Sequence, residues 1–336
     1  MARGLDVGTC FLVGAKQDPS GMTDGEVKSV RDAFIEIDNE PGTKNMLKMS
    51  KIQYIESDEY LYIIGDPALR IANMFKKEVR RPLSKGVISA GETDAEKILL
   101  LLLKSIVAEP DVEGEVCFYS VPAAPIDRDM DILYHKEMFR KIVSSLGFTA
   151  EPMNEAAAIV YSNAAEDGFT ALASSFGAGM VNTALLYQTM IGMEFSVAKS
   201  GDWIDENAAR AVGKTSSQIM AIKERGVNLL DPSEGDDRNY REREAIIMYY
   251  RNLIINTIDA IRDEFKKTDS AVDISEPLPW ILSGGTSQPK NFLKFFQQEF
   301  DKIKNFPIPI SEIRMANDPL NDVAKGLLVA AINFSD

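Results

Sequence analysis

Three glycine-containing turns, far apart in the sequence, constrain the fold of this chain more than any other feature. They are Gly-Leu-Asp-Val-Gly-Thr-Cys at 4–10, Phe-Gly-Ala-Gly at 176–179 and Leu-Ser-Gly-Gly-Thr-Ser at 282–287. Each follows a short apolar run that is typical of a β-strand. Because backbone amides in glycine turns can bind phosphate groups, a fold that brings the three strand ends together would form a nucleotide site.

Length and charge narrow the classes of protein that remain. The 336 residues suffice for two domains with full cores, and the net charge of −14 disfavours non-specific binding to nucleic acid or to anionic lipid. Mg²⁺ could still bring a polyphosphate to such a surface. Cys10 and Cys117 have neither metal-ligand nor disulfide-framework spacing, and no signal peptide or membrane span is visible. We therefore expect a cytoplasmic protein.

The predicted elements follow a similar order twice along the chain. The first half predicts strands at 3–7, 10–16, 27–37, 46–54, 60–64 and 115–121, and helices at 66–76, 93–108, 128–146 and 153–165. The second half predicts strands at 169–174, 180–187, 191–198, 279–283 and 309–314, and helices at 203–212, 215–224, 238–267, 288–303 and 318–333, the last with Pro319 in its first turn. Each half begins with a hairpin and a third strand, which predicts two related α/β domains with a ligand cleft between them.

The order of these motifs resembles the actin-like ATPase superfamily, which includes actin, bacterial MreB, the 70-kDa heat-shock chaperones and sugar kinases. The three turns look like its two phosphate loops and its adenosine motif. The segments 155–162 and 318–326 resemble its two connecting helices, the second being most similar to the MreB form. Shorter stretches at 81–88, 200–205 and 221–225 are similar to MreB or actin segments. The match is collinear over the whole chain.

The resemblance implies a fold and its division into domains. Each domain would be an α/β unit built on an RNase H-like β-sheet with flanking helices, and each would carry a smaller inserted subdomain. Domain I would comprise residues 1–150 and 315–336 with an insertion at about 27–85. Domain II would comprise residues 151–314 with an insertion at about 205–275. The nucleotide would bind in the cleft between the two domains.

The resemblance also implies a role for each matched residue. Asp6 would hold the hydration shell of Mg²⁺. The carboxylate that positions the attacking water would be Glu155 or, as a rival, Glu151. Phosphate groups would be bound by Gly8, Thr9 and Cys10 from domain I and by Gly177, Ala178 and Gly179 from domain II. The nucleoside would be bound by Lys223 and Glu224 at the ribose or base, and by Gly284, Gly285 and Thr286 at the adenosine.

Two positions depart from the superfamily pattern. An acidic residue usually precedes the glycines of the second phosphate loop, and Ser175 occupies that position here. A lysine often stands seven residues after the first aspartate, where this chain has Val13, and Lys16 in the same hairpin is a candidate to replace it. Because phosphoryl transfer depends on charge neutralisation and on positioning, we expect ATP to be hydrolysed slowly.

The resulting expectation is an MreB-like cytoskeletal ATPase that assembles with itself into filaments, with a cytoskeletal adaptor as a further candidate partner. The alternatives are a sugar-kinase-like enzyme, against which Ser175 counts, and a chaperone-like adaptor that forms no filaments. Membrane attachment stays open, because Met74 and Phe75 could insert into lipid or simply pack. The preference for ATP over GTP also stays open. His135, the one histidine, is expected at the surface of its helix.

Overall fold

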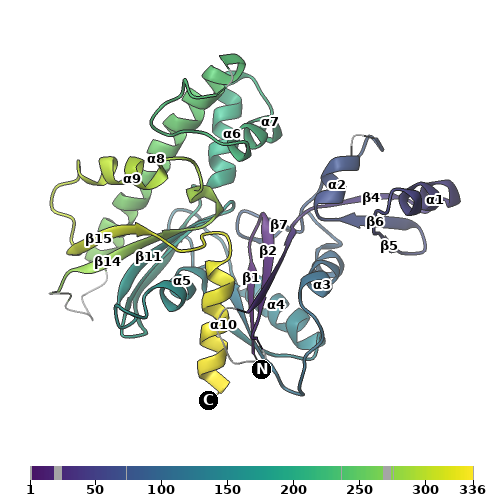
Figure 1. Cartoon of the computed structure of the whole chain (residues 1–336), viewed down its shortest axis with the longest axis horizontal. Helices are drawn as coiled ribbons and strands as arrows, with labels where there is room; N and C mark the ends of the chain where they lie inside the picture. Colours follow the sequence, from purple (N-terminus) through teal and green to yellow (C-terminus); the bar gives the residue numbers. More distant parts are fainter. Residues whose placement is uncertain are drawn as a thin grey trace.

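Two five-stranded sheets form the centres of two halves of the molecule (Figure 1). The computed structural model describes residues 2–18, 25–72, 74–235, 237–267, 274 and 276–335. The first sheet has the strand order β10-β9-β1-β2-β3, and the second has the order β13-β12-β11-β14-β15. The strands of the first sheet are β1 (Ala2–Val7), β2 (Phe11–Lys16), β3 (Glu26–Arg31), β9 (Val116–Val121) and β10 (Thr149–Asn154). Those of the second are β11 (Ala171–Phe176), β12 (Val181–Tyr187), β13 (Met190–Val197), β14 (Leu278–Ser283) and β15 (Ile310–Met315).

The two sheets have the same topology. In each sheet, three consecutive strands form antiparallel pairs with their neighbours. The first of these three strands also pairs in parallel with a fourth strand, and the fourth pairs in parallel with the fifth. Thus β1, β2, β3, β9 and β10 correspond to β11, β12, β13, β14 and β15. This repetition confirms the predicted duplication of an α/β unit. It also places the β1–β2 and β11–β12 turns at corresponding positions in the two halves.

Helices pack on both sheets and between them. The first sheet packs against α3 (Ala95–Ile106) and α4 (Leu133–Ser145), and the second packs against α6 (Gly201–Val212), α8 (Tyr240–Lys267) and α9 (Phe292–Phe300). Between the halves lie α5 (Glu155–Asn163) and α10 (Asp322–Ser335), whose apolar residues form one cluster with residues of both sheets. In Figure 1, α10 stands between the two halves. The two helices therefore connect the halves through a common core.

Glycine allows α5 and α10 to approach very closely. A Cβ atom placed on Gly326 of α10 would lie 1.8 Å from the carbonyl oxygen of Ala158 in α5, far inside van der Waals contact. The facing part of α5 is Ala-Ala-Ala at 156–158, all fully buried. Backbone thus packs directly on backbone at this crossing, with few interlocking side chains.

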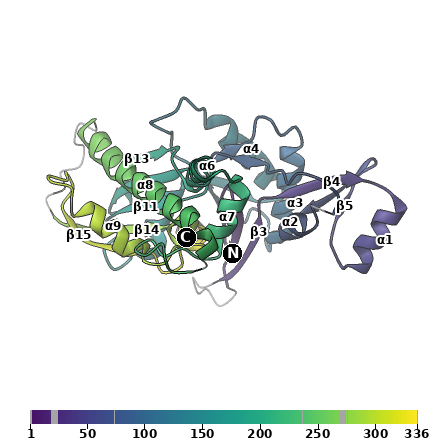
Figure 2. The ribbon, with the colours of Figure 1, turned by 90° about the horizontal axis from the view of Figure 1, so that it is seen from above.

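Smaller elements project from each half. From the first half projects a subdomain made of β4 (Phe34–Asp38), α1 (Pro41–Met49), β5 (Ile55–Glu56), β6 (Tyr60–Ile64) and α2 (Asp66–Ile71), followed by the hairpin β7 (Leu83–Ser84) and β8 (Val87–Ile88). Its β4, β6 and α2 share a core cluster of their own. The second half carries α7 (Ser216–Glu224) and two 3₁₀ turns, Asp237–Asn239 and Gly285–Ser287. Viewed from above, α1 lies at one end of the molecule and β15 at the other (Figure 2).

The structure corrects several predicted elements. Residues 46–54 form no strand, because a helix that begins at Pro41 runs through Met49. The helix predicted from 153 is preceded by β10, and α5 begins only at Glu155, because the side chain of Asn154 accepts hydrogen bonds from the amides of Ala156 and Ala157. The last helix begins at Asp322 rather than 318, so Pro319 lies in the preceding turn.

The structure places His135, Met74 and Phe75 in different environments. His135 is 1% exposed and packs against Phe139, so its predicted surface position is wrong. The apolar spacing of α4 buries it together with Phe139, Ile142 and Val143. Met74 is 69% exposed, whereas Phe75 packs against the core cluster of its subdomain.

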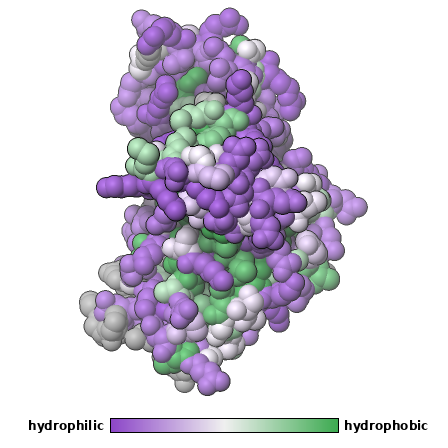
Figure 3. All heavy atoms as spheres, turned by 90° about the vertical axis from the view of Figure 1, so that its right-hand side faces the viewer, coloured by the Kyte–Doolittle hydropathy of each residue, from purple (hydrophilic) through white to green (hydrophobic). Residues whose placement is uncertain are grey.

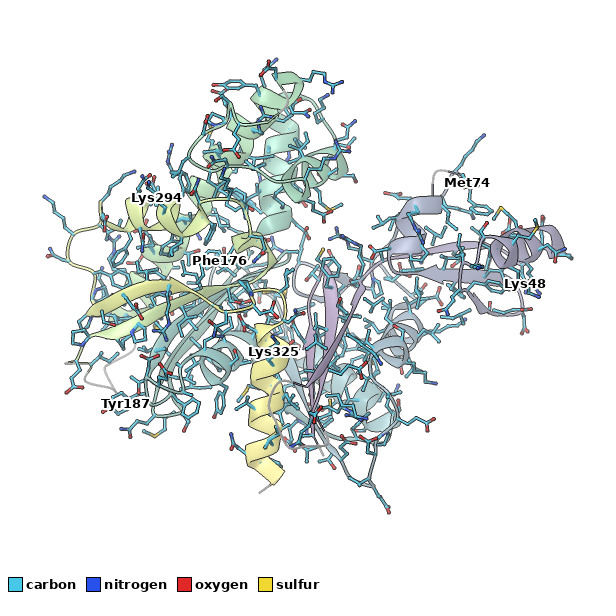
Figure 4. The ribbon with its side chains drawn as sticks, in the orientation of Figure 1. Lys48, Met74, Phe176, Tyr187, Lys294 and Lys325 are labelled. Atoms are coloured by element: carbon cyan, nitrogen blue, oxygen red, sulfur yellow. The ribbon has the colours of Figure 1, made fainter. Side chains whose placement is uncertain are left out.

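The projecting subdomain presents a surface of mixed polarity. Figure 4 shows Met74 and Lys48 at the outer part of this subdomain. Figure 3, which views the molecule from the right-hand side of Figure 1, shows apolar patches among hydrophilic side chains on that face. Within the described residues, no helix is long and apolar enough to cross a membrane.

Candidate functional site

A cavity of about 600 Å³ lies between the two halves and is lined by residues of both. It brings together all the predicted site residues except Glu151. Those that line it are Asp6, Gly8, Thr9, Cys10, Glu155, Gly177, Ala178, Gly179, Lys223, Glu224, Gly284, Gly285 and Thr286. Segments up to 280 residues apart in the sequence thus meet at one site, as the three glycine turns predicted.

Two neighbouring carboxyl groups form one wall of the cavity. Asp6 is the penultimate residue of β1 and accepts a hydrogen bond of 3.0 Å from the hydroxyl of Ser120. Glu155, the first residue of α5, accepts one of 3.0 Å from the side-chain amide of Asn182 and a longer one of 3.5 Å from the hydroxyl of Ser175. The side chain of Asn182 also accepts a hydrogen bond from the amide of Ala123, which fixes its orientation.

Burial and mutual repulsion favour the protonated forms of these carboxyl groups. Burial raises the pKa of Glu155 to about 8, and the neighbouring charge of Asp6 adds to the effect. Burial likewise raises the pKa of Asp6 to about 6, although its hydrogen bonds oppose the shift. A divalent cation would remove this repulsion, and carboxylate oxygens are ligands that Mg²⁺ prefers. The residues present therefore fit the predicted metal.

The two phosphate-loop candidates touch each other. A Cβ atom on Gly179 would lie 2.4 Å from the hydroxyl oxygen of Thr9 and 2.2 Å from the amide nitrogen of Gly86. The amide of Gly86 donates a hydrogen bond of 3.0 Å to that same hydroxyl. The second loop therefore meets the β7–β8 hairpin backbone to backbone and meets the first loop at the hydroxyl of Thr9, an approach that only glycine at position 179 allows.

The third glycine turn is tied to the second. Gly284 has a φ of 95° and lies so close to β11 that a Cβ atom would stand 2.5 Å from the carbonyl oxygen of Phe176. The hydroxyl of Thr286 and the amide of Gly201 both donate to the carbonyl oxygen of Gly177, at 2.9 and 3.1 Å. Figure 4 shows Phe176 near the centre of the molecule, with Tyr187 at the outer end of the same sheet. The end of β11 at Phe176 is therefore the end that faces the cavity.

Polar side chains also line the end of the cavity where the nucleoside is predicted to bind. The helix α7, which begins with a capping box between Thr215 and Gln218, carries Lys223 into the cavity. The ammonium of Lys223 donates to Asp205 at 2.8 Å, and burial raises the pKa of Asp205 to about 6 despite this partner. Within the described residues, Oδ1 of Asp205 and the hydroxyl of Tyr250 have no hydrogen-bond partner.

Two ion pairs cross from one half to the other. Arg31 at the end of β3 contacts Glu224 of α7 at 3.1 Å, and Arg81 contacts Asp202 of α6 at 3.3 Å. Arg31, Glu224 and Asp202 line the cavity. The cavity is thus bordered by pairs that join its two walls.

Some of these residues carry no recognisable signal in the sequence. Arg31 and Tyr250 belong to no motif, whereas Asp202 and Asp205 lie in the stretch 200–205 that resembles MreB and could have been singled out. Glu151 lies within β10, opposite Phe118 of β9, and the described lining of the cavity does not include it. Lys16 contacts Asp111 at 2.9 Å and is likewise outside this lining.

Comparison with known proteins places the fold. Similar solved structures include a MamK double helical filament, with a TM-score of 0.73, 17% identity and 98% coverage of both chains. MreB 5 of Spiroplasma citri bound to AMPPNP has a TM-score of 0.70, 16% identity and coverage of 99% of this chain and 96% of that chain. The ethanolamine utilization protein EutJ from Carboxydothermus hydrogenoformans has a TM-score of 0.56, 14% identity and coverage of 98% and 89%.

These identities establish the fold alone, which is the actin-like fold that the order of motifs predicted. No curated protein is similar to the chain in sequence at a significant level. A protein-family model described as Volactin matches residues 1–331, almost the whole chain. The chain therefore belongs to the Volactin family, and its fold is that of the actin-like ATPases.

Proposed function

We propose that this protein binds ATP with Mg²⁺ in the cavity between its two halves, hydrolyses it slowly, and assembles with itself into filaments in a nucleotide-dependent way. The observation that carries the proposal is the meeting of three glycine turns and two carboxyl groups in one cavity of about 600 Å³. The solved structures of similar fold support it, because one is a MamK double helical filament and another is MreB 5 bound to AMPPNP.

The side chains of the cavity suggest how hydrolysis would proceed. Bound Mg²⁺ would neutralise part of the charge on the phosphate oxygens. Asp6 would hold the hydration shell of the metal. Glu155 would accept a hydrogen bond from the attacking water, with its carboxyl oriented by Asn182. Glu155 is the better supported of the two candidate carboxylates, because it lines the cavity and Glu151 does not belong to the described lining.

Ser175 provides the physical reason for slow turnover. Its hydroxyl lies at the end of β11, 3.5 Å from Glu155, and contributes no negative charge that could order the metal or the water. Phosphoryl transfer depends on such positioning more than on covalent chemistry by the protein. Nucleotide binding, which uses many contacts with the loops, should depend less on this one residue.

The test of binding and hydrolysis uses the purified full-length chain. Calorimetric titration with MgATP should give saturable binding, and phosphate release should be slow but measurable. Glu155→Ala should abolish most of that release while binding persists, and Glu151→Ala is the matched control that should leave release unchanged. Phosphate release that is equal in wild type and Glu155→Ala would remove Glu155 from the mechanism.

Filament formation needs a separate experiment. Light scattering and negative-stain electron microscopy of the wild type should show polymers with MgATP and fewer without nucleotide. Head-to-tail association of identical subunits that does not close into a ring yields such polymers. Absence of polymers over a range of salt and protein concentrations, with nucleotide bound, would leave an ATPase of this fold that acts without filaments.

A further inference from the structure

At the position where the sequence pattern of the superfamily often places a lysine, this chain has Val13. Val13 lines the cavity, and Lys16 is held by Asp111 elsewhere. Among the described residues, the cationic side chains that line the cavity are Arg31, Lys223 and Lys290. Lys223 is held by Asp205 and the carbonyl oxygen of Gly201, and Lys290 contacts Glu234 and the backbone of the second half, whereas Arg31 contacts Cys10 of the first phosphate loop. This leaves Arg31 as the cation to consider near the phosphate loops.

Arg31 lies directly beside the first phosphate loop. It is the last residue of β3, and the ladder between β2 and β3 pairs it with Phe11, the residue that follows Cys10. Its guanidinium carbon lies 4.4 Å from the centroid of the Phe11 ring, and Nη1 lies 3.5 Å from Sγ of Cys10. The same ladder pairs Ser29 with Val13, so Arg31 comes from the strand next to the one in which the lysine is missing.

The present partners of Arg31 are exchangeable. Its Nε donates to Asp66 at 2.9 Å and its Nη1 to Glu224 at 3.1 Å. The side chain of Arg31 is only 14% exposed, but those of Asp66 and Glu224 are 67% and 44% exposed, so both carboxylates can be hydrated when released. Ion pairs with such exposed carboxylates are weak. A polyphosphate carries several charges and matches the planar fork of a guanidinium with two parallel hydrogen bonds.

We infer that Arg31 is a ligand of the polyphosphate and that it exchanges Glu224 for phosphate oxygens when the nucleotide binds. The exchange would release the carboxylate of Glu224, which lines the same cavity on α7, for the hydroxyl groups of the ribose. One ion pair in the nucleotide-free protein would thus become two separate contacts with one ligand. This inference rests on the proposed function, since it assigns residues of the same site.

Two substitutions separate the two contacts. Calorimetric titrations of the full-length protein would use MgADP, which is not hydrolysed, and adenosine, which has no phosphate. Arg31→Gln should weaken MgADP binding about 10- to 100-fold, the range for a charged bidentate contact, and should not weaken adenosine binding, because Glu224 is then free for the ribose. Glu224→Gln should leave MgADP within about 3-fold, because loss of the competing carboxylate offsets the lost ribose contact. It should also leave adenosine binding nearly unchanged, because a ligand without phosphate does not release Glu224 from Arg31.

Lys290→Gln is the matched control, because it removes another cation that lines the cavity and is paired with an exposed carboxylate. It should change the affinity for either ligand by less than about 2-fold. Arg31→Lys keeps the charge without the fork, and should fall between the wild type and Arg31→Gln. If the thermal denaturation of Arg31→Gln shows that this variant does not fold, Arg31→Lys replaces it in the test.

Each other result has a definite meaning. Equal losses for MgADP and adenosine in Arg31→Gln would show that Arg31 only holds the two halves together, and would overturn the inference. The same conclusion follows if Glu224→Gln weakens MgADP as much as Arg31→Gln does. If the wild type binds MgADP and Arg31→Gln binds it equally well, the inference fails while the proposed function stands. If the wild type binds no nucleotide, both fail.

Discussion

The carboxyl pair in the cavity makes a quantitative prediction about pH. Without metal or nucleotide, Glu155 has a pKa of about 8 in the folded protein, against an ordinary value of 4.5. Between these values the folded protein holds a proton that the unfolded chain releases. By linkage, the protonated Glu155 carboxyl contributes to stability at low pH. This contribution is lost as the pH rises from about 4.5 to about 8, and above about pH 8 the loss is complete.

The magnitude follows from the size of the shift. At about 1.4 kcal/mol for each pH unit, a shift from 4.5 to about 8 corresponds to about 5 kcal/mol. Glu155 is only partly buried, and water in the cavity stabilises its charged form, so we expect about 2–4 kcal/mol of this. Glu155→Gln keeps an oxygen that can accept the hydrogen bond from Asn182 but carries no charge. It should therefore be more stable than the wild type by this amount at pH 9, and about equal to it at pH 5.

The assay is urea denaturation at pH 5, 7 and 9 in the presence of EDTA. Glu151→Gln makes the same chemical change outside the described lining of the cavity, and should follow the wild type at every pH. Adding Mg²⁺ at pH 9 should stabilise the wild type more than Glu155→Gln, in which Asp6 keeps its charge but has no charged neighbour to repel. If Glu155→Gln loses as much stability between pH 5 and pH 9 as the wild type does, the reasoning from burial and repulsion is refuted.

Three further predictions follow from other residues. Burial lowers the pKa of His135 to about 4, so the free energy of unfolding should fall as the pH drops from about 6.5 to 4. In urea denaturation at pH 4, the free energy of unfolding of His135→Phe should be higher than that of the wild type by up to about 3 kcal/mol, and at pH 8 the two should match. Gly326→Ala should lower the free energy of unfolding by at least about 2 kcal/mol because its Cβ would meet backbone, whereas Gly42→Ala, with nothing within 4 Å, should change it by less than about 1 kcal/mol. Asp6→Asn should remove most of the Mg²⁺ dependence of ADP affinity measured by calorimetry, and an unchanged dependence would place the metal elsewhere.

The parts of the fold that the sequence predicted are those fixed by local chemistry. The glycine turns after apolar strands identified the loops, since close backbone approach and a positive φ at Gly284 both require glycine. Residues 203–212 and 215–224 were predicted as helices and correspond to α6 and α7, the second of which begins with the capping box at Thr215. These features depend on residues within a few positions of each other.

What escaped prediction depends on partners that are distant in the sequence. His135 looks like a surface residue until α4 is packed on its sheet. Arg31 enters the site because β3 pairs with β2 and because α7, about 190 residues later, brings Glu224 to it. Tyr250 reaches the cavity from the middle of a 28-residue helix whose pattern predicts only burial. Nothing in the neighbouring residues encodes such contacts.

The duplicated topology gives the cleft a direction. Asp6 is the penultimate residue of β1, and Ser175 holds the equivalent place in β11, so two copies of one scaffold present a carboxyl group on one side and a neutral hydroxyl on the other. A symmetric cleft would accept a linear anion in either orientation. This one is unequal at the two equivalent positions, because a cation held at Asp6 would find no carboxylate at Ser175. This difference between two equivalent positions would therefore favour one orientation of the proposed nucleotide over the other.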